Sequence, residues 1–145
     1  SLSSIGPQDV HISEDFSHSI SYAARRIVGL NPTVCAVVAF TQSGFTARLI
    51  SKARPNVPIL APTPDLKTYR QLAMVWGVSP LLAPQIDDIE QMVTTMDSTI
   101  QDLRIGKQGD SIVVLGGLPW RRQKGITNFL RLHELGSPIQ YKFKL

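Results

Sequence analysis

The polar turn TQSG at residues 41–44 holds the side chains with the clearest chemical potential in this sequence. A continuous apolar run precedes it at 34–40, and a helical pattern follows it at 45–53. Hydroxyls and a glycine at the start of a helix can hold an anion, because unpaired N–H groups and the helix macrodipole point there. The turn therefore predicts a phosphate site. The alternative interpretation is that Ser43 simply caps the helix.

Three cations form a second group with chemical potential, on the polar loop at 120–125. Arg121, Arg122 and Lys124 concentrate part of the net charge of +4 in one place rather than along a whole face. Such a focused patch suits a small anion better than a nucleic-acid track. Nucleic-acid binding is disfavoured further because Trp120 has no second aromatic residue beside it for stacking on bases.

Acid–base groups are scarce around these two segments. A catalytic site needs a positioned acid, base or nucleophile, and His133 is the nearest candidate, although its alternating segment favours the solvated face of a strand. His11 and His18 have no partners in metal-ligand spacing. Cys35 lies in the apolar run, where we expect it to pack as a small hydrophobe. We expect no catalytic residue, no metal and no cofactor in this chain.

Length and composition indicate an ordinary globular chain. Its 145 residues suffice for one domain, for which we expect a core over about 13–135 and a tail at 136–145. No apolar run approaches the roughly 20 residues that span a bilayer, and the first ten residues do not resemble a signal peptide. The single cysteine cannot form an internal disulfide, which favours a cytoplasmic location. We therefore expect no membrane partner.

Alternating helical and strand patterns position the two polar segments. Helices are expected at 13–28, 45–53, 63–77 and 87–103, and strands at 34–40, 57–61, 78–83, 111–115 and 127–135. In the first helix, we expect one face to point into the core, formed by Phe16, Ile20, Ala23 and Ile27. The helices at 13–28 and 87–103 carry more apolar residues than one sheet face needs, which favours self-association.

This alternation predicts an α/β fold of three layers, α/β/α, around a mainly parallel five-stranded sheet. The loop before the last strand is too short for a helix, so we expect that strand to be antiparallel. In the strand order 3-2-1-4-5, the order reverses between strands 1 and 4, and ligands bind at such points beyond the carboxyl ends of strands. The turn at 41–44 and the loop at 120–125 then meet at one mouth.

Five stretches resemble the C-terminal domain of pyruvate kinase in order and spacing, over about residues 16–135: ISYAARRI, AVVAFTQSGFTARLISKARPNVPILAPTPD, QLAMVWGVSPLL, GDSIVVLGGLP and GITNFLRLHEL. The most specific pieces are the SG-x-[ST]-A turn before a helix that ends in R-P, and the later G-x-TN. The resemblance implies a domain outside the catalytic barrel, with an allosteric effector pocket and a part in the subunit interface of a homotetramer. It also implies that the barrel, whose motifs are absent here, performs phosphoryl transfer from phosphoenolpyruvate to ADP with Mg²⁺ and often K⁺.

The resemblance also implies individual site residues. The family's effector-phosphate turn matches Thr41, Gln42, Ser43, Gly44, Phe45 and Thr46. Phe45 stands where many relatives have a basic residue, which removes one charge from the pocket. The family's effector loop matches 117–127 and adds Arg121, Arg122, Lys124 and Gly125 as candidates. Arg104 matches a basic residue that reaches the second phosphate of the sugar in some relatives.

Two classes of function follow. The resemblance implies a regulatory domain of pyruvate kinase that binds a phosphorylated sugar effector, joins the catalytic barrel of the parent enzyme and contributes to assembly into a tetramer. The alternative is a free-standing domain of the same fold that acts as an enzyme or a binder for a small phosphorylated metabolite. The scarcity of acid–base groups counts against an enzyme, so we expect the chain alone to convert no phosphoenolpyruvate.

Overall fold

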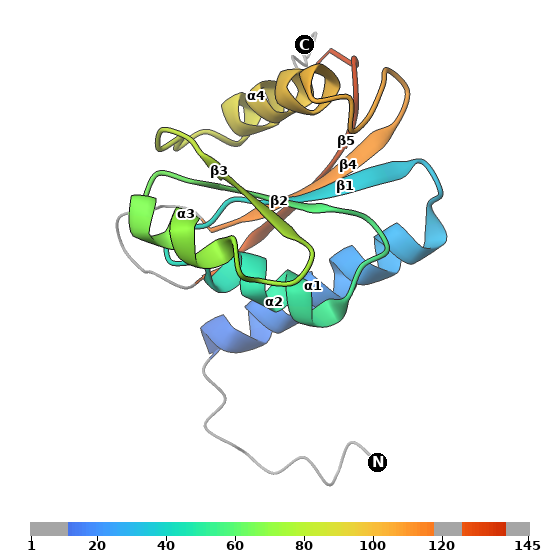
Figure 1. Cartoon of the computed structure of the whole chain (residues 1–145). Coiled ribbons are helices and arrows are strands. Elements are labelled where there is room, and N and C mark those ends of the chain that lie inside the picture. The colour runs from blue at the N-terminus through green and yellow to red at the C-terminus, as the bar shows by residue number, and fades with distance from the viewer. Residues whose placement is uncertain (1–11, 118–125, 139–145) are drawn as a thin grey trace, which may run out of the picture.

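A five-stranded sheet organises the residues that the computed structural model describes, 12–117 and 126–138 (Figure 1). The elements in chain order are α1 (Ile12–Leu30), β1 (Val34–Ala39), α2 (Phe45–Ala53), β2 (Ile59–Thr63), α3 (Leu66–Leu72), β3 (Val78–Leu82), α4 (Ile89–Asp102), β4 (Ser111–Gly116) and β5 (Phe129–Glu134). The strand order is β3-β2-β1-β4-β5, and only the pairing of β4 with β5 is antiparallel. The predicted order and the antiparallel last strand are confirmed.

Helices cover both faces of the sheet, with α4 on one face and α1, α2 and α3 on the other (Figure 1). The central strands are therefore buried on both sides. Ala36 and Val38 of β1 belong to the core beneath α4, whereas Val37 and Ala39 belong to the core beneath the other three helices. This double burial explains why β1 is a continuous apolar run without alternation. The predicted three-layer fold is confirmed.

The buried face of α1 differs in part from the predicted one. Ser21 and Ala24 are buried, and Ile20 and Ile27 are half-buried against the core. Phe16, expected in the core, is 59% exposed, so that prediction is wrong. Small side chains let α1 lie close to α2, where the Ser21 hydroxyl donates to a backbone carbonyl at 3.4 Å. Hydrophobic periodicity alone favours the larger side chain and misses this close approach.

The third helix is shorter than predicted. α3 begins after Asp65, whose carboxylate accepts from the Thr68 N–H at 3.0 Å, rather than after Thr63. Thr63 still belongs to the ladder of β2, because its carbonyl accepts from the Ala83 N–H at 3.0 Å. Trp76, expected on the apolar face of this helix, lies beyond its end and is 54% exposed. The Arg54 guanidinium stacks over its ring, 4.1 Å from the centroid.

The second strand lies two residues later than predicted, at Ile59–Thr63, so Pro58 precedes it. This shift carries the carboxyl end of β2 up to the polar turn after β1. The Pro62 carbonyl accepts from the Thr41 N–H at 3.1 Å. The start of α3 is thereby placed beside the turn. Among the helices of the described ranges, none has the length and apolar character to cross a membrane.

Candidate functional site

The carboxyl ends of β1 and β4 meet where the strand order reverses. Ala39 pairs with Leu115, and the Phe40 N–H donates to the Leu115 carbonyl at 2.9 Å. The turn 41–44 leaves this edge from β1, and Gly117 leaves it from β4. Arg121, Arg122, Lys124 and Gly125, the predicted candidates of the basic loop, lie outside the described residues. Of the two segments predicted to form the site, the polar turn lies within the described residues.

A left-handed glycine shapes the turn. Gly44 is the N-cap of α2, with a φ of 92°, a conformation that residues with a Cβ adopt at a cost. Its N–H donates to the buried Thr41 hydroxyl at 2.8 Å, which closes the turn on itself. A Cβ at this position would also collide with the side chain of Arg48. The sequence of the turn thus fixes the direction in which α2 starts.

Ser43 is exposed at the start of α2 and is not its N-cap residue. Its hydroxyl accepts from the Phe45 N–H at 3.4 Å, which is longer than an ordinary N–H···O bond of about 2.7–3.2 Å. No side chain caps the helix, so the next N–H groups, of Thr46 and Ala47, have no side-chain acceptor within the described residues. The amino end of α2 therefore presents N–H groups and a hydroxyl that an anion could engage.

Thr41 and Thr46, both predicted to bind the phosphate, form hydrogen bonds within the protein instead. Thr41 is held by Gly44, as described above. Thr46 is buried, and its hydroxyl lies 2.7 Å from the hydroxyl of Thr127 in the GITN stretch. The Thr127 N–H in turn donates to the Ser17 hydroxyl of α1 at 3.0 Å. These bonds hold α2, α1 and the approach to β5 together, and they leave Ser43 as the outward hydroxyl of the turn.

Arg48 supplies a positive charge that the sequence analysis missed. It lies one turn into α2, and its Nη1 donates to the Ser43 carbonyl at 3.4 Å. The guanidinium therefore rests over the turn, close to the start of α2 at Phe45. Its position in the sequence could have revealed it, because the side chain of a residue four positions after the N-cap can fold back over the start of the helix.

Arg104 does not belong to this site, contrary to the prediction from the resemblance. It follows α4 and lines a separate pocket with Lys107 and Asp110, ahead of the first residue of β4. That is the amino end of β4, whereas the polar turn lies at the carboxyl ends of the strands.

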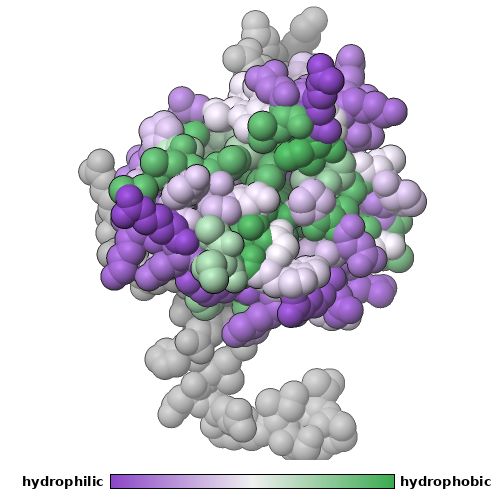
Figure 2. Space-filling model, in the orientation of Figure 1, coloured by the Kyte–Doolittle hydropathy of each residue, from purple (hydrophilic) through white to green (hydrophobic). Residues whose placement is uncertain are grey.

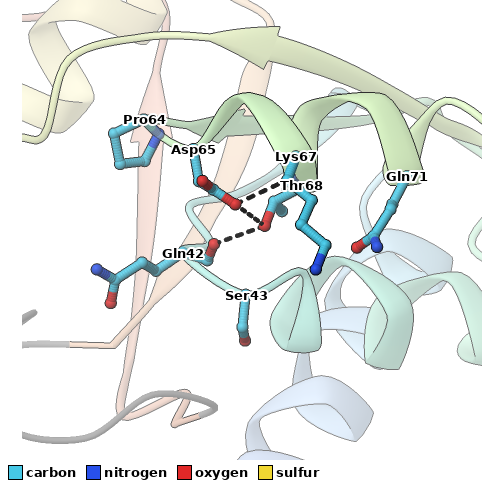
Figure 3. Close-up of a pocket in the computed structure, with 7 residues that line it drawn as sticks. All are labelled: Gln42, Ser43, Pro64, Asp65, Lys67, Thr68 and Gln71. Carbon is cyan, nitrogen blue, oxygen red and sulfur yellow. Dashed lines mark hydrogen bonds between the residues drawn. The ribbon is translucent and has the colours of Figure 1, made fainter.

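A pocket of about 520 Å³ adjoins the turn on the side of α3 (Figure 3). Its lining residues come from the turn and from the first two turns of the α3 region: Gln42, Ser43, Pro64, Asp65, Lys67, Thr68 and Gln71. The sequence predicts a helix start near Asp65 but not that it lies beside the turn, because the proximity of α3 to the turn depends on β2 lying next to β1. Sequence reasoning therefore found Gln42 and Ser43 and missed Lys67 and Gln71.

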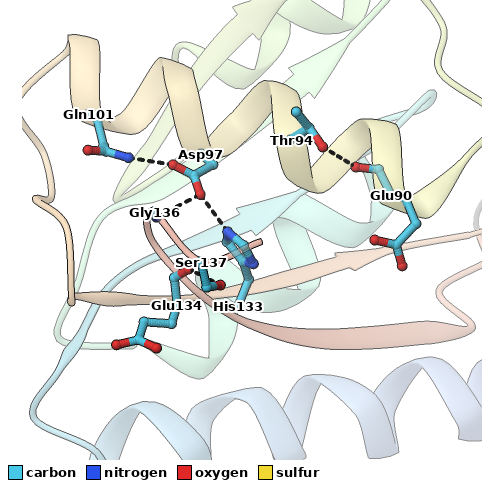
Figure 4. Close-up of polar contacts among 8 residues, drawn as sticks. All are labelled: Glu90, Thr94, Asp97, Gln101, His133, Glu134, Gly136 and Ser137. Carbon is cyan, nitrogen blue, oxygen red and sulfur yellow. Dashed lines mark hydrogen bonds and ion pairs between the residues drawn. The ribbon is translucent and has the colours of Figure 1, made fainter. Parts of the chain in front are cut away.

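His133 lies in a different part of the molecule from the turn. It is 5% exposed, not on a solvated face as predicted, and it pairs with Ile112 near the start of β4. Its Nε2 lies 2.6 Å from Oδ2 of Asp97 on α4 (Figure 4). Burial raises the pKa of Asp97, but hydrogen bonds from His133, Gly136 and Gln101 outweigh burial and hold that pKa below its ordinary value. This cluster binds α4 to β5.

Other reactive groups in the described ranges show no catalytic arrangement. No three side chains of His, Cys, Asp or Glu gather there in a way that could hold a metal ion. Cys35 is half-buried against the core beneath α4, as predicted. Burial and the charge of Asp110 raise the pKa of its thiol, which disfavours the reactive thiolate. The arrangement at the turn suits binding of an anion, not acid–base chemistry.

Comparison with known proteins places this geometry in a family. Residues 18–133 match the family model described as pyruvate kinase, alpha/beta domain. The chain belongs to this family. The match covers β1 to β4, α2 to α4 and β5 up to His133, so the turn, the pocket and the pair of Asp97 with His133 all lie on the pyruvate kinase α/β domain.

Curated relatives agree with this assignment. A pyruvate kinase of Agrobacterium vitis is 42% identical over 119 residues, which are 82% of this chain and 25% of the relative. A pyruvate kinase of Staphylococcus epidermidis is 40% identical over 110 residues, covering 76% of this chain and 19% of the relative. One of Mycobacterium tuberculosis is 35% identical over 135 residues, 93% of this chain and 28% of the relative. The chain thus spans about a quarter of the length of these pyruvate kinases and corresponds to their C-terminal part.

Proposed function

We propose that this chain is the regulatory domain of a pyruvate kinase and that it binds a phosphorylated effector on the turn 41–46. The observation that carries the proposal is the exposed Ser43 beside the left-handed Gly44, an N-cap residue that has no side chain to cap α2. A phosphate there accepts N–H bonds from the first turn of the helix and a hydroxyl bond from Ser43. Arg48 adds a nearby positive charge.

The position of the turn supports binding of a regulator. It lies at the point where the strand order reverses, the usual place of ligands in such sheets. Asp65 is the one carboxylate among the described lining residues of the adjoining pocket, and it caps α3. We therefore assign phosphoryl transfer, with its Mg²⁺ and K⁺, to a barrel outside this chain, and we expect the whole enzyme to act in the cytoplasm.

Substitution of Ser43 tests this function. Ser43→Asp places a carboxylate where the phosphate would lie, so like-charge repulsion removes binding of inorganic phosphate and of sugar phosphates in calorimetric titrations. The matched control is Ser98→Asp, on the exposed face of α4 across the sheet, which leaves binding unchanged. Equal affinities of the parent and Ser43→Asp, or no binding by the parent, would refute the proposal.

Assembly is the second part of the proposed function. Large apolar side chains stay exposed on α1 and on the neighbouring edge strand β5: Phe16 is 59% exposed, Tyr22 63%, Leu30 66% and Leu132 52%. Exposed apolar area on adjacent elements favours contact with a second copy, and a two-fold axis lets the same patch serve both copies. We infer that the domain self-associates through α1 and β5, as part of a larger homo-oligomer.

Sedimentation and light scattering test this assembly. Phe16→Glu and Leu132→Glu each place a charge in the patch and shift the 145-residue chain towards monomer. Met74→Glu, at a residue that is 89% exposed between α3 and β3, serves as the matched control and leaves association unchanged. A parent chain that is monomeric at high concentration would contradict the inferred contact.

A further inference from the structure

The helix α1 carries an apolar stripe beside the face that it buries. The buried face runs through Ser17, Ser21 and Ala24. About 100° round the helix, one position earlier in the chain, lies a second row of five apolar residues: Phe16, Ile20, Ala23, Ile27 and Leu30. Its two end members, Phe16 and Leu30, are 59% and 66% exposed, and the three between them are half-buried. The stripe therefore forms a shoulder between the core and the surface.

The stripe has nearly the same spacing when it is read in either direction of the chain. Ala23 stands at its centre. Ile20 and Phe16 precede the centre by three and seven positions, and Ile27 and Leu30 follow it by four and seven. When identical helices pack antiparallel about a two-fold axis, each residue faces one that lies equally far on the other side of the axis. An axis beside Ala23 thus matches the stripe to itself, and the small central side chain permits a close helix crossing.

A pocket of about 230 Å³ lies where this pairing brings Phe16 of a second copy. It opens between Ile27 and Asn31 of the α1 end of the chain, the level that faces Phe16 across the axis. Ile27 shares the lining with Val34 and with Leu132 of β5, so the stripe adjoins the edge strand. The pocket is smaller than the roughly 300–1,000 Å³ of small-molecule sites, which favours a single side chain as its occupant.

Polar side chains that line this pocket already have partners within the chain. The Asn31 amide donates to a backbone carbonyl of α1 at 2.8 Å, and the Thr33 hydroxyl donates to the Ser111 hydroxyl at 3.3 Å. His133 Nε2 lies 2.6 Å from Oδ2 of Asp97. A polar ligand would have to compete with these bonds, whereas an aromatic ring buries its apolar surface without replacing them.

Apolar side chains are also exposed on the face that carries β3, between α3 and α4 (Figure 2). Leu82, at the end of this edge strand, is 56% exposed. Pro80, in the middle of β3, has no N–H to offer a further strand, so pairing along this edge is disfavoured. On α1, by contrast, a self-matching stripe and a pocket for one of its own side chains lie together.

We propose that two copies of this chain pack α1 against α1 in antiparallel orientation, about a two-fold axis beside Ala23. Phe16 of each copy fills the pocket between α1 and β5 of the other. The proposal rests on the self-association inferred above, and it adds the position of the axis, the direction of the helices and the anchoring side chain. An aromatic residue seated in a pocket is a typical anchor of an interface, and the two-fold symmetry uses this anchor twice.

Disulfide trapping in the full 145-residue chain tests the direction of the pairing, because a disulfide needs Cα atoms about 4.4–6.8 Å apart. Ala23→Cys should form a covalent dimer on mild oxidation. A mixture of Phe16→Cys and Leu30→Cys should form one too, whereas Phe16→Cys alone should not, because its two sites lie about 21 Å apart along antiparallel helices. The controls are Arg25→Cys, exposed on another side of α1, and the parent, whose Cys35 is half-buried.

Sedimentation equilibrium tests the anchor. Phe16→Ala should weaken self-association about tenfold or more, as expected for an aromatic side chain removed from a pocket. Phe16 is largely exposed within one copy, so the variant should unfold like the parent in urea. Leu66→Ala removes an apolar side chain that is 45% exposed at the start of α3, and it is the matched control that should leave association unchanged.

The outcomes separate this contact from self-association itself. If the chain associates but neither Ala23→Cys nor the mixture is trapped, or if Phe16→Cys alone or Arg25→Cys is trapped as readily, the antiparallel contact is wrong while association stands. If Leu66→Ala weakens association as much as Phe16→Ala, Phe16 is not the anchor. If the parent is monomeric at high concentration, the contact and the inferred assembly fail together.

Discussion

Two carboxylates at opposite edges of the sheet, Asp97 and Asp65, differ in burial and in their hydrogen-bond partners. Asp97, buried between α4 and β5, accepts from the Gly136 N–H at 3.0 Å and from the Gln101 amide at 2.5 Å, and lies 2.6 Å from His133 Nε2. Asp65, exposed beside the polar turn, competes with a backbone carbonyl for the proton of Thr68. The Asp97 cluster lies inside the fold, whereas Asp65 lies at the surface and lines the pocket beside the turn.

This difference separates stability from binding. A buried polar group whose partners are in place rigidifies the fold, whereas polar groups at the surface stay accessible to a ligand. A second, partly exposed contact joins α4 to β5, in which Arg131 Nη1 lies 3.0 Å from Glu90 Oε1. We therefore expect substitutions in the α4–β5 cluster to change unfolding, and substitutions at the turn to change affinity.

Removal of the buried carboxylate should give the largest effect. Asp97→Ala leaves His133 and the Gly136 N–H without their partner, which costs about 2–4 kcal/mol of unfolding free energy. Urea denaturation measures this cost, and phosphate affinity of the folded variant should not change. Asp102→Ala, at the exposed end of α4, is the control and should stay within about 0.5 kcal/mol of the parent. Equal losses in the two variants would contradict a specific role for Asp97.

The same carboxylate makes stability depend on pH in the acid range. The folded pKa of Asp97 lies below its ordinary value of 3.8. A group with a lowered folded pKa contributes stability above its unfolded pKa, and this contribution is lost as the pH falls through the folded pKa. The stability difference between the parent and Asp97→Asn should therefore shrink as the pH falls below 4. A difference that instead grows on acidification would show that the sign is wrong.

Backbone geometry at the turn should give a smaller effect. Gly44→Ala forces a residue with a Cβ to a φ of 92°, which costs about 1–2 kcal/mol, and it displaces Arg48. Both effects weaken phosphate binding as well as stability. Gly29→Ala has open space around the new methyl group in α1 and should raise stability by about 0.5–1 kcal/mol. Denaturation and phosphate titration of both variants measure the two effects. If Gly44→Ala lost stability but kept its full phosphate affinity, the turn would not be the phosphate site.

The sequence predicts the frame well because its signals are local. α2 has the predicted bounds, and the alternation of strands and helices predicts the mainly parallel sheet. What failed depends on contacts between distant segments. The partner of His133 is Asp97, 36 positions away on another element, and no periodicity reveals it. Phe16 was misplaced because two serines of α1 pack where larger side chains would not fit.

The candidate site also contains residues that local sequence predicts and residues that only contacts between distant segments reveal. The turn was found because hydroxyls, a glycine and a helix start are adjacent in sequence. Lys67 and Gln71 were missed because their proximity to Ser43 exists only once β2 pairs with β1. Arg104 was misassigned because matching by sequence does not tell at which edge of the sheet a connection lies.

Titration of the isotope-labelled 16.0 kDa chain with inorganic phosphate, followed by amide NMR, tests the central claim most directly. The account predicts saturable shifts of the amide signals of residues 43–47, at the amino end of α2, with the amides around Asp97 and His133 unchanged. Absence of saturable shifts at 43–47, or larger shifts in the α4–β5 cluster, would contradict it.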